Sequence, residues 1–232
     1  MTTAVLIDGA FFIKRIRYFE KHNAYNAEKM AALAFQLALR HLSQKINNVK
    51  QHDDLYRIFF YDCAPLEKKM HNPISKKPVD FAKSEEAIFR KALHNELVKK
   101  RKLALRLGKL SDNLVSWRLK PHIMSDLLKG KIERRDITEN DVVIDVKQKG
   151  VDMKIALDIA TIALKKQADR IVLISGDSDF VPAAKLARRE GIDFILDPMW
   201  QNIPEDLFEH IDGLYSSYQK PPHISQSELP EA

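Results

Sequence analysis

Four aspartates occupy positions where carboxylates could hold a metal ion. Asp8 follows the apolar run 4–7, Asp152 lies two residues after Gly150, and Asp177 and Asp179 lie together just after a second apolar run. Two carboxylates about 4 Å apart repel by roughly 4 kcal/mol at an effective dielectric constant near 20, so a cluster of four needs a cation. Hard oxygen ligands suit Mg²⁺ or Mn²⁺ better than zinc. The pattern therefore predicts a divalent-metal site.

Alternating strands and helices are expected to bring these aspartates together. The predicted elements are strands at 3–7, 55–61, 171–175 and 192–196, and helices at about 27–42 with Asn26 as N-cap, 152–166, and 178–190 ending at Gly191. Such alternation predicts a parallel sheet. Ligands of an open α/β sheet collect beyond the carboxyl ends of the strands, where the strand order reverses. We therefore expect the strand before Asp8 to lie beside the strand before Asp177.

The middle of the chain departs from this alternation. Three prolines mark an irregular connection after Cys63, a basic helix is predicted from 84 to about 106, short strands are predicted at 114–119 and 142–146, and 129–141 reads as an exposed excursion. We expect residues 1–218 to form one domain, with a basic helical and irregular elaboration at about 64–141. Residues 219–232 read as a flexible tail.

Composition narrows the class of protein. The 232 residues are 45% hydrophobic, enough for one sizeable core, and 38 Lys and Arg against 32 Asp and Glu give a formal charge of +6. This excess favours a polyanionic partner. The lone Cys63 excludes an intramolecular disulfide and a Cys-based zinc site. No apolar run approaches the length of a membrane span and no secretion signal is visible, so we expect a cytoplasmic protein.

Other acidic residues compete for a place in the site. Asp158 lies six residues beyond Asp152, some 240° around a helix, so the two cannot share a face. A salt bridge to Lys154 or a contact behind the ligands is the favoured interpretation of Asp158. Asp62 and Asp197 also end strands, but each is expected to have no direct metal contact.

Basic residues offer contacts to phosphates. Four of them, Lys99, Lys100, Arg101 and Lys102, are consecutive, and Lys147 and Lys149 come just before Asp152. Lys and Arg position a polyanion without reading its sequence. The alternative for the consecutive group is a solvated surface, which is as common. Lys147 and Lys149 are the better placed of the two groups.

Three motifs resemble the NYN domain family, in particular its LabA-like bacterial group. They are Val5-Leu6-Ile7-Asp8-Gly9, Lys147-Gln148-Lys149-Gly150-Val151-Asp152 with Ala156-Leu157-Asp158, and Val172-Leu173-Ile174-Ser175-Gly176-Asp177-Ser178-Asp179-Phe180. The resemblance implies a PIN-like three-layer α/β fold, with a central, mainly parallel sheet flanked by helices and an acidic Mg²⁺ or Mn²⁺ site that cleaves RNA. Asp8, Asp152, Asp177 and Asp179 match the catalytic and metal-binding positions, and Ser175 matches an auxiliary one.

One position departs from this family pattern. Many relatives carry Asn two residues after the first glycine, where this chain has Phe11. The polar contribution of that Asn is therefore absent or comes from another residue.

The leading hypothesis is a metal-dependent ribonuclease that hydrolyses RNA phosphodiester bonds. The alternative is a non-catalytic RNA-binding or regulatory adaptor that retains the NYN fold. A haloacid-dehalogenase-type phosphatase is disfavoured, because Ala10 and Val181 stand where that chemistry needs acids. DNA stays an alternative substrate, since no residue identifies a contact to a 2′-hydroxyl. A homo-oligomer is compatible with the sequence.

Overall fold

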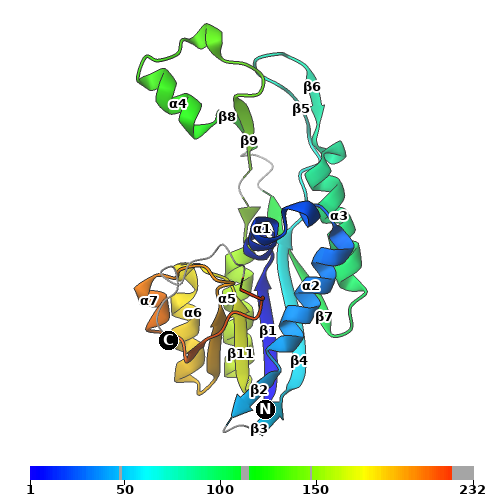
Figure 1. The fold of residues 1–232 in the computed structure, drawn as a ribbon, viewed down its shortest axis with the longest axis vertical. Helices are drawn as coiled ribbons and strands as arrows, with labels where there is room; N and C mark the ends of the chain where they lie inside the picture. Colours follow the sequence, from blue (N-terminus) through cyan, green and yellow to red (C-terminus); the bar gives the residue numbers. More distant parts are fainter. Residues whose placement is uncertain (47–48, 111–114, 147, 221–232) are drawn as a thin grey trace.

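The computed structural model of the chain describes residues 1–46, 49–110, 115–146 and 148–220 (Figure 1). Lys147 and most of the expected tail, 221–232, lie outside these described residues.

A parallel sheet forms the centre of the protein. In the described residues its strand order is β10-β7-β4-β1-β11-β12-β13. The strands are β1 (Thr2–Asp8), β4 (Asp54–Cys63), β7 (Leu103–Leu110), β10 (Gln148–Lys149), β11 (Arg170–Ile174), β12 (Asp193–Asp197) and β13 (Gly213–Leu214). Only β10, which pairs with β7, is antiparallel among them. Chain order runs outward from β1 in one direction through β4 and β7, and from β11 in the other, so the strand order reverses between β1 and β11. The expectation that these two strands are adjacent is confirmed.

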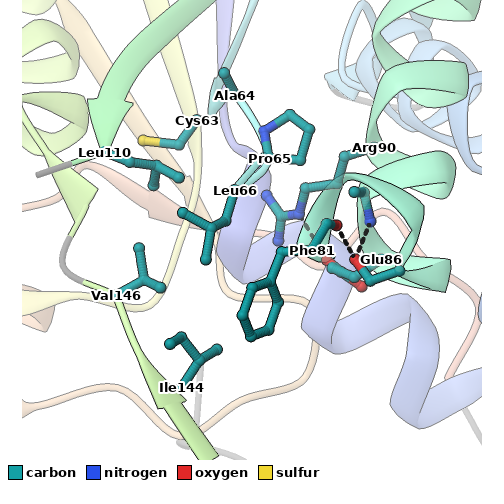
Figure 2. A pocket seen from close by; sticks show the side chains of 12 residues that line it. Cys63, Ala64, Pro65, Leu66, Phe81, Glu86, Arg90, Leu110, Ile144 and Val146 are labelled. Atoms are coloured by element: carbon teal, nitrogen blue, oxygen red, sulfur yellow. Dashed lines mark hydrogen bonds and ion pairs between the residues drawn. The ribbon is translucent and has the colours of Figure 1, made fainter. Parts of the chain in front are cut away.

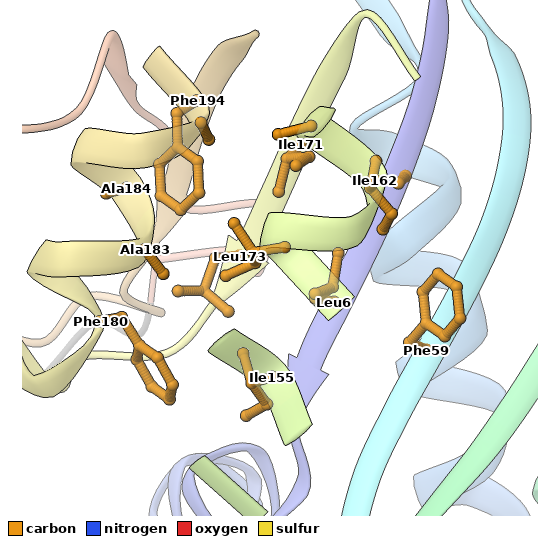
Figure 3. Close-up of a cluster of buried hydrophobic side chains, with 14 of the residues drawn as sticks. Leu6, Phe59, Ile155, Ile162, Ile171, Leu173, Phe180, Ala183, Ala184 and Phe194 are labelled. Carbon is orange, nitrogen blue, oxygen red and sulfur yellow. The ribbon is translucent and has the colours of Figure 1, made fainter. Parts of the chain in front are cut away.

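Helices cover both faces of the sheet. One face packs against α1 (Gly9–Phe19), α2 (Ala27–Arg40) and α3 (Glu85–Val98), and the other against α5 (Val151–Leu164) and α6 (Val181–Arg189). Figure 3 shows the second interface, where Leu6 and Leu173 of the sheet meet Ile155 of α5 and Phe180. The strands β1 and β11 are buried throughout their centres, which explains their uninterrupted apolar sequences. The expected three-layer α/β fold is confirmed.

Side chains at the helix starts explain where the helices begin. Asp8, Asn26 and Ser84 each accept a hydrogen bond from the backbone N–H three residues on, as N-caps of α1, α2 and α3. Gly150 precedes α5 with a φ of +79°, and Gly191, with a φ of +78°, follows α6. The predicted roles of Asn26 and Gly191 are confirmed.

An arm projects from the carboxyl-end side of the sheet (Figure 1). It contains the antiparallel strands β8 (Ser116–Leu119) and β9 (Val142–Asp145), with α4 (Pro121–Leu128) and η4 (Arg134–Asp136) between them. The hairpin of β5 (Lys69–His71) and β6 (Pro78–Asp80) and the turn η2 (Phe81–Lys83) lie beside it. Asn72 donates to the backbone oxygen of Glu139 at 3.3 Å, and Lys77 pairs with Glu139 at 3.1 Å. These contacts tie the hairpin to the arm.

The remaining elements are short: η1 (Lys21–Asn23), the hairpin β2 (Ser43–Ile46) and β3 (Val49–His52), η5 (Ser178–Phe180) and α7 (Glu205–Phe208). Among the described residues, no helix combines the length and the apolar character needed to cross a membrane.

The expected basic helix at 84–106 is wrong at its C-terminal end. Helix α3 stops at Val98, residues 99–102 form the turn, and Leu103 begins β7 in the central sheet. Lys and Arg are good helix formers, so the sequence of this basic turn predicts a continuation of the helix. The helix expected at 178–190 also begins differently, as the 3-10 turn η5 followed by α6.

Close packing at Gly9 gives the first prediction. A Cβ at this position would lie 2.4 Å from the backbone oxygen of Tyr61 and 2.6 Å from Cε1 of Phe60, and the backbone oxygen cannot move without disturbing β4. We expect Gly9→Ala to lower the free energy of unfolding by about 3 kcal/mol in urea titrations. The control Gly191→Ala, which has positive φ but open space around the Cβ, should lose only about 1 kcal/mol. Equal losses in both variants would contradict this packing argument.

Candidate metal centre

Asp8 stands at the switch point of the sheet. Its Oδ1 accepts a hydrogen bond from the Phe11 N–H at 3.1 Å, and its Oδ2 accepts one from the Ser175 hydroxyl at 3.3 Å. Ser175 is fully buried and follows β11, so the parallel pairing of β1 with β11 makes this contact. Two donors from different elements therefore fix the orientation of the Asp8 carboxylate.

Burial makes the charge of Asp8 unfavourable. Desolvation, assisted by the negative charge of Asp152, raises the pKa of Asp8 to about 6, although the hydrogen bonds from Phe11 and Ser175 oppose the shift. A carboxyl group with a raised pKa at the mouth of a parallel sheet is a candidate for a functional site.

The other three aspartates lie at the starts of α5 and η5, on the face of the sheet opposite to α1. Asp152 is in the first turn of α5, and Asp177 caps η5 by accepting from the Asp179 N–H at 3.1 Å. Desolvation first, and then the charges of Asp177 and Asp179, raise the pKa of Asp152. The charge of Asp152 contributes to the raised pKa of Asp8, and the charges of Asp177 and Asp179 contribute to the raised pKa of Asp152. The four carboxylates therefore form one electrostatically coupled group at the carboxyl edge of the sheet.

The chemistry of this donor set fits Mg²⁺ or Mn²⁺. All four side chains offer carboxylate oxygens, Asp152, Asp177 and Asp179 are exposed to solvent, and a cation would relieve the repulsion among them. Softer ligands are engaged elsewhere: Cys63 is buried, and burial raises the pKa of its thiol. Within the described residues, no three His, Cys, Asp or Glu side chains already stand in the arrangement of ligands around one metal ion.

Two further aspartates have structural partners instead. Asp62 is buried and pairs with Arg90 and with His94, the latter at 2.8 Å. Asp197 is buried and accepts from Ser217 Oγ at 2.6 Å and pairs with His41 at 2.8 Å. These partners agree with the expectation that neither residue contacts a metal directly.

Asp158 has partners different from the expected one. It accepts a hydrogen bond from the Tyr61 hydroxyl at 2.8 Å and pairs with Arg106 at 3.3 Å, whereas Lys154 donates to the backbone oxygen of Leu107. The salt bridge to Lys154, one of the two interpretations of Asp158, is therefore wrong, and the other, a contact behind the metal ligands, stays a prediction. The sequence pattern predicts Arg106 at the end of a helix, but Arg106 lies on β7, where it pairs with Asp158.

The two groups of predicted RNA-binding residues lie in different places. Lys149 is exposed on β10, directly before the glycine that starts α5 and thus close in the chain to Asp152; Lys147 lies outside the described residues. Residues Lys99, Lys100, Arg101 and Lys102 precede β7, and the Lys102 ammonium donates to the Leu55 backbone oxygen near the start of β4. Since β4, β7 and β1 are parallel, the basic turn lies toward the amino edge, opposite the aspartates.

Phe11 and Gln201 flank the turn that carries Asp177. A Cβ on Gly176 would lie 2.8 Å from Nε2 of Gln201 and 3.0 Å from Cε2 of Phe11, so both side chains pack against this glycine. The Gln201 side chain thus places a carboxamide beside Gly176, next to the apolar ring of Phe11. Sequence reasoning missed Gln201, because it follows β12 in an irregular segment with no motif around it.

The raised pKa of Asp8 gives a prediction about stability. A pKa of about 6 against 3.8 corresponds to about 2 to 3 kcal/mol of unfavourable free energy in the charged form. Because the folded-state pKa is the higher one, the contribution of Asp8 to stability is favourable below pH 4 and is lost as the pH rises through 6. Asp8→Asn keeps a capping oxygen, so in chelator at pH 7.5 it should unfold at higher urea concentration than the wild type.

The stabilisation by Asp8→Asn should shrink on lowering the pH to 4. Asp54→Asn, on the exposed start of β4, removes one negative charge elsewhere and serves as the control. A pH-independent difference between wild type and Asp8→Asn would contradict the assignment of the shift to Asp8.

Comparisons with known proteins give the family context. The model of the NYN domain matches residues 117–216, a range that includes Asp152, Ser175, Asp177 and Asp179. No curated protein matches the chain. Among solved structures, a protein of unknown function from Vibrio parahaemolyticus is 17% identical, with a TM-score of 0.43 and coverage of 93% of this chain and 91% of that one. NYN domains are generally nucleases, so the match suggests nuclease-like chemistry. The match covers 100 of the 232 residues, so this part of the chain resembles the NYN domain.

Proposed function

We propose that this protein is a metal-dependent ribonuclease of the LabA-like NYN group, hydrolysing RNA phosphodiester bonds with Mg²⁺ or Mn²⁺ at Asp8, Asp152, Asp177 and Asp179. The observation that carries the proposal is the gathering of these carboxylates at the switch point, where desolvation first and then their mutual repulsion raise the pKa of Asp8 and of Asp152. The motifs around Asp8, Asp152 and Asp177 support the LabA-like assignment.

The residues of the site have separate roles in this proposal. Asp8 is the oriented ligand, since Phe11 and Ser175 each hold one of its oxygens and leave a lone pair on each for a cation. Asp152, Asp177 and Asp179 are the exposed ligands that face incoming RNA. A bound cation would activate water for attack and stabilise the charge that develops on the scissile phosphate. Ser175 is a positioning residue that acts through Asp8.

Lysines beside the site support a polyanionic substrate. Lys149 lies on the strand that leads into α5, and Lys147 is close to it in the chain. We assign both to the RNA backbone. The basic turn of Lys99, Lys100, Arg101 and Lys102 stays a predicted RNA contact, and its place toward the amino edge means that only an extended RNA could reach both it and the aspartates.

The proposal predicts that single carboxylates are essential for cleavage. Asp8→Asn and Asp177→Asn should each lower Mn²⁺-dependent cleavage of labelled single-stranded RNA by at least about 100-fold while keeping the circular dichroism spectrum of the wild type, because each removes a charged ligand. Asp158→Asn is the matched control and should retain cleavage, since Asp158 binds Tyr61 and Arg106. Chelator should abolish wild-type cleavage.

A direct metal measurement accompanies the activity assay. Mn²⁺ should raise the melting temperature of the wild type and of Asp158→Asn, but not of Asp8→Asn or Asp177→Asn. Unchanged cleavage in both variants would overturn the proposed function. RNA binding by the wild type with no metal-dependent product would favour the non-catalytic adaptor instead.

A further inference from the structure

A cavity of about 350 Å³ lies where β4 and β7 end, between α3 and the base of the arm (Figure 2). Its wall is mainly apolar and comes from four separate parts of the chain, with Pro65, Leu66, Phe81, Leu110, Ile144 and Val146 as the principal side chains. Figure 2 shows these side chains around a shared space, with Glu86 and Arg90 along one side. The cavity is therefore an apolar recess with a single charged edge.

The charged edge is held in a fixed arrangement. Arg90 Nε donates to Glu86 at 2.6 Å and its guanidinium pairs with buried Asp62, while Arg17 donates to the other Glu86 oxygen at 2.8 Å. Although desolvation opposes it, these hydrogen bonds from Arg90 and Arg17 hold the pKa of Glu86 below its usual value. Each Glu86 oxygen keeps a free lone pair, so the edge can accept from an N–H group of a ligand.

Contacts around Gly108 connect the cavity with the aspartates. The position of a Cβ on Gly108 would be 2.9 Å from Cys63 Sγ, 2.7 Å from Val151 Cγ2 and 3.0 Å from the Lys149 backbone oxygen. Cys63 lines the cavity, and Val151 precedes Asp152. The recess and the carboxylates are thus neighbours on the same edge of the sheet.

Two lysines lie at this junction. Lys109 of β7 and Lys149 of β10 are directly opposite each other in the antiparallel pair, and both side chains are exposed. Like charges in opposite positions repel, and in the part of the chain that the structure describes no carboxylate forms an ion pair with either lysine. A second hollow, whose charged lining residues are Glu67, Lys68 and Lys109, adjoins the recess through Ala64 and Leu110. An anion between Lys109 and Lys149 would remove the repulsion.

We propose that the recess binds one unstacked nucleobase of single-stranded RNA, while Lys109 and Lys149 hold the phosphate between that base and the aspartates. This inference rests on the proposed ribonuclease function. A base offers two apolar faces for Phe81 and the aliphatic walls, and N–H groups for Glu86, and the lysine pair matches its backbone charge. Bases in an A-form duplex are not available for insertion, so single-stranded RNA is the substrate class.

Binding of a defined RNA in chelator tests the recess apart from catalysis. The probe is a fluorescein-labelled single-stranded RNA of about 12 nucleotides, intact or with one base removed at successive positions. Removal of the inserted base should weaken wild-type binding by about ten-fold, and removal of bases elsewhere should have little effect. Ala64→Trp fills the recess from its exposed rim and should bind intact RNA about ten-fold more weakly, with no further loss on any base removal.

Two comparisons guard against general damage to the protein. Ala92→Trp, on a part of α3 outside the recess, should bind and respond to base removal as the wild type does. Phe81→Ala should show the same loss of dependence on the inserted base as Ala64→Trp. The inference is overturned if Ala64→Trp retains the wild-type response to base removal, if the wild type shows no position dependence, or if it binds no RNA.

The lysine pair has its own measurement. Lys109→Ala combined with Lys149→Ala should weaken binding and reduce the slope of log affinity against log salt by about 1, the loss of one shared phosphate contact. The control combines Lys165→Ala, at the exposed C-cap of α5, with Lys185→Ala, on the exposed side of α6. It should leave the slope unchanged. Equal slopes in the two double variants would overturn the phosphate contact.

Failure of this inference and failure of the ribonuclease proposal give different results. Suppose that wild-type cleavage requires Mn²⁺ and Asp8, and that Ala64→Trp cleaves and binds RNA normally. This result would support the nuclease proposal and contradict the proposed base-binding role of the recess. Suppose instead that binding depends on the position of the removed base, that Ala64→Trp abolishes this dependence, and that no metal-dependent cleavage occurs. This result would support base binding in the recess and contradict the nuclease proposal.

Discussion

The parallel pairing of β1 with β11 is the interaction on which the rest of the site depends. The register places Ile7 beside Ile174, so the next residues, Asp8 and Ser175, leave the sheet side by side and form a hydrogen bond. The strand order reverses between these two strands, and ligands of open α/β sheets bind beyond the strand ends at such a point. The carboxylate at the end of β1 is thus held in a fixed orientation at the switch point of the sheet.

This arrangement has an energetic cost that the fold must offset. The desolvated Asp8 raises the free energy of the folded state at neutral pH, and Asp152 adds repulsion to it. The compensation comes from the two apolar layers on either side of the sheet, where Leu6 and Val5 of the same strand are completely buried. Each fully buried aliphatic side chain contributes about 1.5 to 3 kcal/mol, so one strand suffices to offset one unfavourable carboxylate. Such local destabilisation within a stable frame is what a binding site for a cation requires.

Features set by neighbouring residues in the chain could be predicted from the sequence, and those set by distant residues could not. The caps at Asn26 and Gly191 and the buried strand at 171–175 depend on local chemistry and were predicted correctly. The end of α3 was not, because the run after Val98 has high helical propensity and only the pairing of β7 with β4 decides its conformation. Likewise Asp158 meets Arg106 across 52 positions of sequence, a contact that no local spacing indicates.

The site itself follows the same division. The aspartates could be proposed as a group because each ends or begins a regular element, and the topology of an open parallel sheet gathers such positions at one edge. Gln201 and the recess at the base of the arm carry no such regularity: the recess is assembled from α3, the ends of β4 and β7, and the strand β9. No single segment of the sequence contains enough of it to form a motif.

The distribution of charge matters more for function than its total. The chain has a formal charge of +6, yet the most concentrated basic run, at 99–102, ends up toward the edge of the sheet opposite the aspartates. Lys109 and Lys149 are far apart in the sequence, but the antiparallel pairing of β7 with β10 sets them opposite each other next to the start of α5. Salt screens exposed charges over about 8 Å at physiological ionic strength, so under the proposed function a lysine must lie near the carboxylates to offset their repulsion of a phosphate. A short antiparallel strand at the end of an otherwise parallel sheet therefore supplies the positive charge that the acidic edge lacks.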